Sequence, residues 1–515
     1  HCRPVAGPSR WPHGAGFERG VQQPGFGDRE ARMTSQPLPP PGPDAPTLGQ
    51  VLASWLPFAD AASVDLPLAR LLRLSLFQVS VGMATVLLNG TLNRVMIVEL
   101  GVPTFLVALL IAIPLIAAPF RALIGHKSDT HKSVLGWRRV PYIWFGTLLQ
   151  FAGLAIMPFA LILFENDTTF TLATVAAAAS FLLTGIGIHV TQTAGLALTS
   201  DLAPEDKRPR AVALLYVMLL VGMMFAAFVM GGLLIDFSNT RLIQVIQGAA
   251  VITMALNLVA LWKQEARNTA LTQGDEGGPT FGDLWNSFVR DGSNARLLTG
   301  IGIGSAGFAM QDALLEPYGG EVLGLSVGAT TGLTGAWAMG ALAGFMLSAR
   351  SLGRGNDPLR IAGAGLVTGL AAFLLVIFAA PFVSPLMLFL GAFAIGLGLG
   401  LFSVGTLIEA MNLAKSASAG LALGAWGAVQ ATCAGAGIAL GGAFRDGFAA
   451  LAINGGNVIV GATRATGYTS VYIIEILLLL AGLAAIGPLV GRHRRTATEL
   501  KGDADQSFGL REFPT

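Results

Sequence analysis

The sequence predicts an all-α membrane protein whose twelve transmembrane helices form two pseudo-symmetric halves of six helices. Three observations carry this prediction: the composition, a series of apolar stretches, and an uneven distribution of lysine and arginine between the segments that join them. Of the 515 residues, 53% are hydrophobic and only 12% are charged, whereas a soluble protein carries about 25% charged residues. Because each spanning helix needs roughly 20 apolar residues, twelve spans and their loops account for nearly the whole chain.

Twelve apolar stretches lie between Leu71 and Val490, and each is long enough to cross a bilayer. A helix is expected for every stretch, because lipid tolerates only a backbone whose polar groups are satisfied internally. The predicted spans cover residues 73–97, 103–123, 140–163, 171–198, 210–235, 243–262, 297–317, 327–349, 360–381, 385–411, 419–443 and 468–490.

The basic residues are concentrated in alternate loops. From Val51 onward, the segments predicted on one side hold 23 lysines and arginines, and those on the other side hold four, namely Arg94, Arg241, Arg445 and Arg464. Cytoplasmic loops of membrane proteins carry such an excess. The asymmetry therefore predicts that both termini lie in the cytoplasm, and it directs the search for function to side chains between helices inside the bilayer.

The two halves share features that suggest a duplication. Residues 69–72 open the first half with the letters ARLL, and residues 295–298 open the second with the same letters, 226 positions later. A short amphipathic pattern at 48–56 and another at 281–288 precede these openings, with the i, i+3, i+4, i+7 spacing of an apolar helical face. Helices on the cytoplasmic surface and caps of the bundle both fit this pattern. Two six-helix halves are the architecture of the major facilitator superfamily.

The predicted organisation has five parts. They are a disordered leader at 1–46, a six-helix half with its entry helix at 47–262, a cytoplasmic central loop with an amphipathic helix at 263–296, a second six-helix half at 297–491, and a cytoplasmic tail at 492–515. The leader lacks the apolar core of a signal peptide. We expect the native chain to begin at Met33, and N-terminal sequencing of the native protein would test this.

The loop between the second and third spans resembles a loop signature of the major facilitator superfamily. Gly125 permits a tight helix exit, and Asp129 is followed by Arg138 and Arg139 at a longer spacing than the signature has. The next cytoplasmic loop, which includes Arg210, also resembles a superfamily turn. The resemblance implies a conformational latch between the halves, whereas anchoring of a basic loop at the membrane surface explains the same residues without a latch.

Polar side chains inside predicted spans are the candidate functional residues, because they are costly to bury in lipid. The candidates in spans 1, 4 and 7 are Asn89, Asn93, Arg94, His189, Gln192, Gln311, Asp312 and Glu316. For the neutral residues, the alternative to a functional role is that they form hydrogen bonds between helices. Two acids four residues apart favour a proton site or a buried basic partner, for which Arg94 is a candidate. Exposure of Glu316 at the membrane edge would remove that argument.

Four segments together resemble one family within this superfamily. They are Leu74–Gly82, Gly136–Gly146, Thr191–Gly195 and Met310–Gly320, the last with the letters MQDALLEPYGG. They resemble the bacteriochlorophyll delivery family of PucC/LhaA-type light-harvesting complex assembly proteins. The resemblance implies a multi-pass protein of the bacterial inner, intracytoplasmic photosynthetic membrane that serves light-harvesting complex 1 or 2. The partners it implies are antenna polypeptides, bacteriochlorophyll synthase and the membrane insertion machinery, with no nucleic acid.

The same resemblance implies bacteriochlorophyll as bound cargo and no other cofactor. Its magnesium prefers imidazole, amide, carboxylate or water ligands, so the expected pigment or partner site joins the candidates of spans 1, 4 and 7. Asn89, Asn93, His189 and Gln192 offer donors of this kind, with His189 as the candidate imidazole ligand, and no other metal site is expected. No catalytic constellation is recognisable, so an enzyme is not expected. A proton-coupled solute transporter using Asp312 and Glu316, and a pigment-free assembly scaffold, are the alternatives.

Overall fold

The computed structural model describes residues 66–116, 137, 139–164, 167–204, 208–265, 292–413, 419–454 and 465–491. These residues form helices and turns and contain no strand. The leader, both predicted amphipathic helices, almost all of the central loop and the tail lie outside the described residues.

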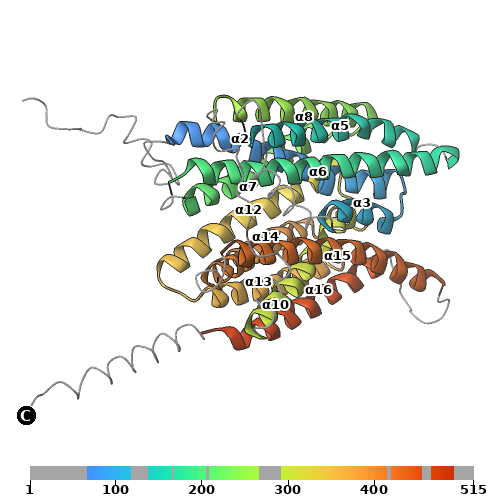
Figure 1. The fold of residues 1–515 in the computed structure, drawn as a ribbon. Helices are drawn as coiled ribbons and strands as arrows, with labels where there is room; N and C mark the ends of the chain where they lie inside the picture. The colour runs from blue at the N-terminus through green and yellow to red at the C-terminus, as the bar shows by residue number, and fades with distance from the viewer. Residues whose placement is uncertain are drawn as a thin grey trace, which may run out of the picture. The chain divides into compact units, whose positions relative to one another are not determined.

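Among its described residues, the first half contains six helical segments in the predicted places (Figure 1). They are α2 (Leu68–Thr85), continued by η2 (Val86–Leu92) and η3 (Val95–Glu99), then α3 (Thr104–Ile116), α5 (Val140–Leu163), α6 (Phe170–Leu202), α7 (Arg208–Leu233) and α8 (Asn239–Leu261). The short turn η4 (Asp167–Thr169) precedes α6. The helix α5 has the predicted bounds, and Pro141 in its first turn suits a helix start.

The second half repeats this arrangement. Its segments are α10 (Gly292–Ala309), η6 (Met310–Ala313) and α11 (Leu315–Glu321), then α12 (Val327–Gly353), α13 (Pro358–Ala379), α14 (Pro385–Leu413), α15 (Ala419–Asn454) and α16 (Ala465–Ile486), followed by η7 (Gly487–Leu489). In the described residues, ten helices are long and apolar enough to cross a membrane. The two other predicted spans are α3, described over 13 residues, and the broken α10–α11 segment. The chain is thus a multi-pass, all-α membrane protein, as predicted.

Two spans depart from the regular helices that the sequence predicts. Span 7 was expected as one helix over 297–317, but a 3₁₀ turn, η6, interrupts it. Pro317 explains the break, because proline has no N–H for the carbonyl of Ala313 and its ring clashes with that carbonyl. Span 1 is π-helical over η2 and η3. Such segments are frequent at functional sites, and both irregular spans carry candidate residues.

The repeated ARLL letters have the same structural role in each half. Arg70 donates hydrogen bonds to the side-chain oxygen of Gln264 at 3.2 Å and to its carbonyl oxygen, just beyond α8. Arg296 donates to the carbonyl oxygens of Ala485 at 2.9 Å and Ala484 at 3.4 Å, at the end of α16. Each arginine therefore joins the first helix of its half to the last one.

Small residues allow the helices of each half to approach closely, as in other membrane proteins. On α13, a Cβ atom at Gly365 would lie 2.5 Å from the carbonyl oxygen of Gly398 and 2.6 Å from the amide nitrogen of Phe402, both on α14. Gly363 lies on the same helix, yet a Cβ atom there would meet only a Leu483 methyl group at 3.6 Å.

We therefore expect Gly365→Ala to destabilise the protein by about 1–3 kcal/mol, because a backbone cannot yield as a side chain can. Gly363→Ala is the matched control and should have little effect. Thermal unfolding of the two variants in the same detergent measures the difference. Equal melting temperatures would show that α13 and α14 are not packed as described.

Candidate functional site

Span 1 and span 7 meet at their irregular segments, and this contact joins the two halves. The amide of Asn93 donates to the carbonyl oxygens of Asn89 at 3.1 Å and Asp312 at 3.4 Å. Close by on span 1, the hydroxyl oxygen of Thr91 lies 3.2 Å from that of Thr331. Polar groups predicted from two distant parts of the sequence therefore share one interface.

Glu316 is buried at this interface, with 3% of its surface exposed. Thr334 on α12 donates a hydrogen bond to its Oε1 atom, whereas its Oε2 atom is buried without a hydrogen-bond partner. Gly90 on span 1 is needed for this approach, because a Cβ atom there would press on the Glu316 carboxylate and lie 3.0 Å from the Thr334 hydroxyl. The alternative that places Glu316 exposed at the membrane edge is therefore wrong.

Arg94 supplies positive charge beside Glu316, as the sequence suggested. Its side chain is buried, forms an ion pair with Glu99 and donates to the carbonyl oxygen of Leu325 at 3.2 Å. It also interacts electrostatically with Glu316. Arg94 therefore belongs to a network that runs from span 1 to the loop after α11, rather than to a simple pair.

Asp312 and Glu316 do not form the pair that their spacing suggested. Asp312 lies in the 3₁₀ turn η6 and Glu316 lies in α11, and Gln311 donates its side-chain amide to the half-buried Asp312 carboxylate. The acid that interacts electrostatically with Asp312 is Glu475 on α16. The break in span 7 thus places the two predicted acids in different surroundings.

Glu475 is the functional candidate that the sequence analysis missed. It is fully buried, and neither carboxylate oxygen has a hydrogen-bond partner of good geometry. The Gln311 backbone, Asp312 and Tyr472 are the polar groups with which it interacts. The sequence did contain a signal for this residue, because Glu475 is the lone acid in the apolar run YIIEILLLL. Burying its carboxyl group in lipid is as unfavourable as burying that of Asp312, which is a candidate for this reason. Three acids, rather than two, therefore lie near the contact between the halves.

We expect Glu475→Leu to leave thermal stability unchanged or to raise it, because an unsatisfied buried carboxyl group destabilises a fold that a similar apolar side chain would fill. Melting temperatures of purified wild type and variant test this. A loss comparable to that of a disrupted core would mean that Glu475 holds a stabilising interaction. Unchanged stability with lost biological activity would assign the carboxyl group to function.

His189 and Gln192 lie half-buried and three residues apart on α6. This helix packs against α2 and α5, and Gln150 on α5 donates to the Thr191 hydroxyl at 2.9 Å. The structure therefore brings the span 1 and span 7 candidates together, while the inclusion of His189 and Gln192 in the same site stays a prediction. The described residues contain no cluster of three or more His, Cys, Asp or Glu side chains suited to a metal ion.

A second polar cluster lies where α11, α15 and α16 meet. Arg445 forms ion pairs with Glu321 and with Asp446, the latter at 2.9 Å, and its guanidinium carbon lies 4.6 Å from the centre of the Tyr468 ring. Asp446 also accepts a hydrogen bond from the amide of Phe105, at 2.8 Å. The cluster therefore ties the second half to the start of α3 in the first half.

The latch residues are only partly described. Gly125, Asp129 and Arg138 lie outside the described residues. Arg139 forms an ion pair with Asp201 at 3.0 Å in the first half, and its backbone amide donates to Glu265 just after α8, so neither contact reaches the second half. Arg210 is exposed in the first turn of α7. The bridge between halves that the loop signature implies therefore stays a prediction.

An apolar groove of about 630 Å³ runs between α10, α15 and α16. Figure 1 shows these three helices side by side. Leu440 and Phe444 on the groove wall are 50% and 38% exposed, so the groove opens on the surface that would face lipid. Its lining has few polar groups and consists of Ala295, Leu298, Thr299, Gly302, Ile303, Ala306, Met310, Val429, Cys433, Ala436, Gly437, Leu440, Phe444, Ile474 and Leu478.

Comparison with known proteins places the chain in a family. The family model described as PUCC protein matches residues 91–494. Protein PucC of Rhodovulum sulfidophilum is 58% identical over 76% of this chain and 88% of its own length. An uncharacterized protein from the puhA-bchM intergenic region of Rhodobacter capsulatus is 51% identical over 91% of this chain and 98% of its own.

More distant similarities extend the comparison and define the fold. The Bacteriochlorophyll synthase 44.5 kDa chain of Rhodobacter capsulatus is 27% identical over 72% of this chain and 85% of its own. The crystal structure of the nucleoside transporter NupG matches with a TM-score of 0.57 and 16% identity, over 81% of this chain and 98% of that one. This likeness shows the major facilitator fold that the two halves predicted. With a family model that matches most of its length and relatives more than half identical to it, the chain belongs to the PUCC protein family.

Proposed function

We propose that this protein is an assembly factor for bacterial light-harvesting complexes, which holds bacteriochlorophyll or an antenna polypeptide in the photosynthetic membrane before handing it on. Family membership supports this proposal, and so does the name of the more distant relative, Bacteriochlorophyll synthase 44.5 kDa chain. The observation that carries it is the groove between α10, α15 and α16. A groove lined by apolar side chains and open towards lipid suits an apolar cargo that arrives from the bilayer.

The size of the groove is compatible with this role. Ligand pockets in proteins usually have volumes of roughly 300–1,000 Å³, and the groove has about 630 Å³. Its polar side chains are the hydroxyl of Thr299 and the thiol of Cys433, and thiols are poor ligands for magnesium. The groove therefore fits the hydrocarbon tail or ring edge of a chlorin, or one face of an antenna helix. Amide, imidazole or carboxylate ligands for the metal would come from residues such as Asn89, His189 or Asp312.

Pigment analysis of the purified protein tests the proposal. The full chain, purified in mild detergent from a phototrophic host, should carry bacteriochlorophyll that organic extraction releases. Deletion of the gene should lower antenna levels while the pigment pool persists. Normal antenna assembly in the deletion strain would refute the role, and pigment-free protein that still co-purifies with antenna polypeptides would select the scaffold alternative.

The buried acids favour one second candidate function, proton-coupled transport of a small solute. Asp312, Glu316 and Glu475 are carboxyl groups near the contact between the halves, and such groups form proton relays in transporters. Uptake into vesicles with an imposed proton gradient distinguishes this candidate. Gradient-driven flux that is lost in Asp312→Asn would favour transport, and absence of flux for every solute tested would favour assembly. Neither candidate requires catalysis, and we expect no enzymatic activity.

A further inference from the structure

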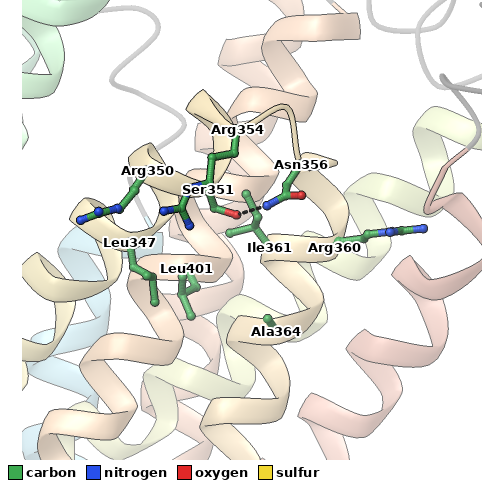
Figure 2. Close-up of a pocket in the computed structure, with 9 residues that line it drawn as sticks. All are labelled: Leu347, Arg350, Ser351, Arg354, Asn356, Arg360, Ile361, Ala364 and Leu401. Atoms are coloured by element: carbon green, nitrogen blue, oxygen red, sulfur yellow. Dashed lines mark hydrogen bonds between the residues drawn. The ribbon is translucent and has the colours of Figure 1, made fainter.

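A cavity of about 340 Å³ lies where α12 ends and α13 begins (Figure 2). Its lining residues include neither the three acids nor any residue of the groove. Three arginines, Arg350, Arg354 and Arg360, line one part of it together with Ser351 and Asn356, and apolar side chains line the rest. We name this cavity the arginine pocket. No role described above uses these three side chains.

Among the residues that the structure describes, the arginines of this pocket have no acidic partner. No carboxylate of the described residues forms an ion pair with any of them. Asp357 is close in sequence, but its two oxygens accept the backbone amides of Leu359 and Gly491, each at 2.8 Å. Arg94, Arg139 and Arg445, in contrast, are each paired with a carboxylate. The pocket therefore carries positive charge that the described protein does not neutralise.

The geometry of the pocket suits an anion held at a membrane surface. Arg350 lies in the last turn of α12, and Arg354 caps the helix four residues later, so both lie at the same end of α12. Figure 2 shows Arg360 extending to the opposite side of the pocket from Arg350, with Asn356 between them. Asn356 donates a hydrogen bond to the Ser351 hydroxyl at 2.8 Å, which fixes the turn. Guanidinium groups bind phosphate oxygens with paired hydrogen bonds.

The apolar part of the pocket continues onto the outer surface of the helices. Leu347 is 52% exposed, Ala364 is exposed, and Leu401 forms the floor. In a membrane protein this surface faces acyl chains. The distribution of basic residues predicts that this end of α12 and α13 lies on the cytoplasmic side. Anionic lipids attract basic residues near that surface.

We propose that the arginine pocket binds the phosphate headgroup of an anionic phospholipid, with an acyl chain along Leu347 and Ala364. Arg350 and Arg354 hold the phosphate, and Arg360 lies at the opposite rim, close to the headgroup region. The pocket therefore recognises a phosphate group that carries acyl chains, because polar and apolar side chains line the same cavity.

Native mass spectrometry of the detergent-solubilised full chain, titrated with phosphatidylglycerol or with phosphatidylcholine, tests this proposal. Wild type should retain phosphatidylglycerol preferentially. In the double variant Arg350→Gln/Arg354→Gln, affinity for phosphatidylglycerol should fall by about tenfold or more, since each basic residue near the surface contributes a several-fold increase in affinity. Affinity for phosphatidylcholine should not change. Arg354→Lys keeps the charge and should retain most of the preference.

Arg241→Gln is the matched control, since Arg241 is an exposed arginine elsewhere in the chain that pairs with Asp236 at 3.7 Å. It should bind both lipids as wild type does. Equal binding of the two lipids by wild type, or an unchanged preference in the double variant, would overturn the proposal. Millimolar inorganic phosphate that displaced the lipid completely would show a site for free phosphate and would also overturn it. Wild-type melting temperatures in the variants exclude misfolding as the cause.

Discussion

Arg94→Met should be far more damaging than Glu316→Gln, although the two residues belong to one network. Removal of the arginine breaks its ion pair with Glu99 and its bond to the Leu325 carbonyl, and it takes positive charge away from the buried Glu316. Leaving buried polar groups without their partners costs about 1–3 kcal/mol for each group. Removal of the carboxylate charge leaves Arg94 with its ion pair to Glu99 and its bond to Leu325. We therefore expect Arg94→Met to deplete the protein from membranes and Glu316→Gln to be tolerated.

The double variant Arg94→Met/Glu316→Gln separates this explanation from a general requirement for Arg94. Without the carboxylate charge, the loss of the arginine should cost less, so the double variant should melt above Arg94→Met. Melting temperatures in detergent and protein yield in isolated membranes measure the coupling. Additive effects of the two substitutions would show that Arg94 stabilises the protein through Glu99 and Leu325 alone.

Thr299→Trp should abolish cargo retention while leaving the fold intact. Thr299 lies on the groove wall and is exposed, and its hydroxyl bonds to Ala295 of its own helix, at 2.8 Å. A tryptophan there would fill part of a groove of about 630 Å³ without displacing a core side chain. We expect bound pigment in the purified protein, and antenna levels in the cell, to fall at least severalfold.

Val367→Trp is the matched control for this substitution. Val367 is 52% exposed on α13 and does not line the groove. It should retain wild-type pigment content and antenna levels, which excludes a general effect of a bulky side chain on the lipid-facing surface. Wild-type behaviour of Thr299→Trp in both measurements would remove the groove from the proposed mechanism.

The sequence predicted the fold because its signals are additive over long segments. Hydropathy over about 20 residues and the distribution of basic residues each average over many positions, and lipid permits few alternatives to a helix. All twelve predicted spans correspond to helical segments, although the described part of α3 is shorter than its predicted span. The break at η6 was missed because a single proline, Pro317, decides it, and transmembrane helices often tolerate proline without a break.

The sequence predicted which residues belong to the site better than it predicted the contacts that they make. Asn93, Arg94, Asp312 and Glu316 were identified from their cost in lipid, and the structure brings them to the contact between spans 1 and 7. Their partners come from distant segments. That Thr334 bonds Glu316 and that Glu475 interacts with Asp312 depends on how α12 and α16 pack, which residue spacing within one span does not encode.

The groove is formed by α10, η6, α15 and α16, which all belong to the second half of the chain. Its opening therefore does not depend on the first half moving away. An alternating-access carrier must rock its two halves to expose a central site, but a molecule that dissolves in the bilayer could enter and leave this groove sideways while the halves stay locked. A covalent crosslink between Phe105 and Asp446, introduced as a cysteine pair, should then stop any solute transport and yet leave pigment exchange running.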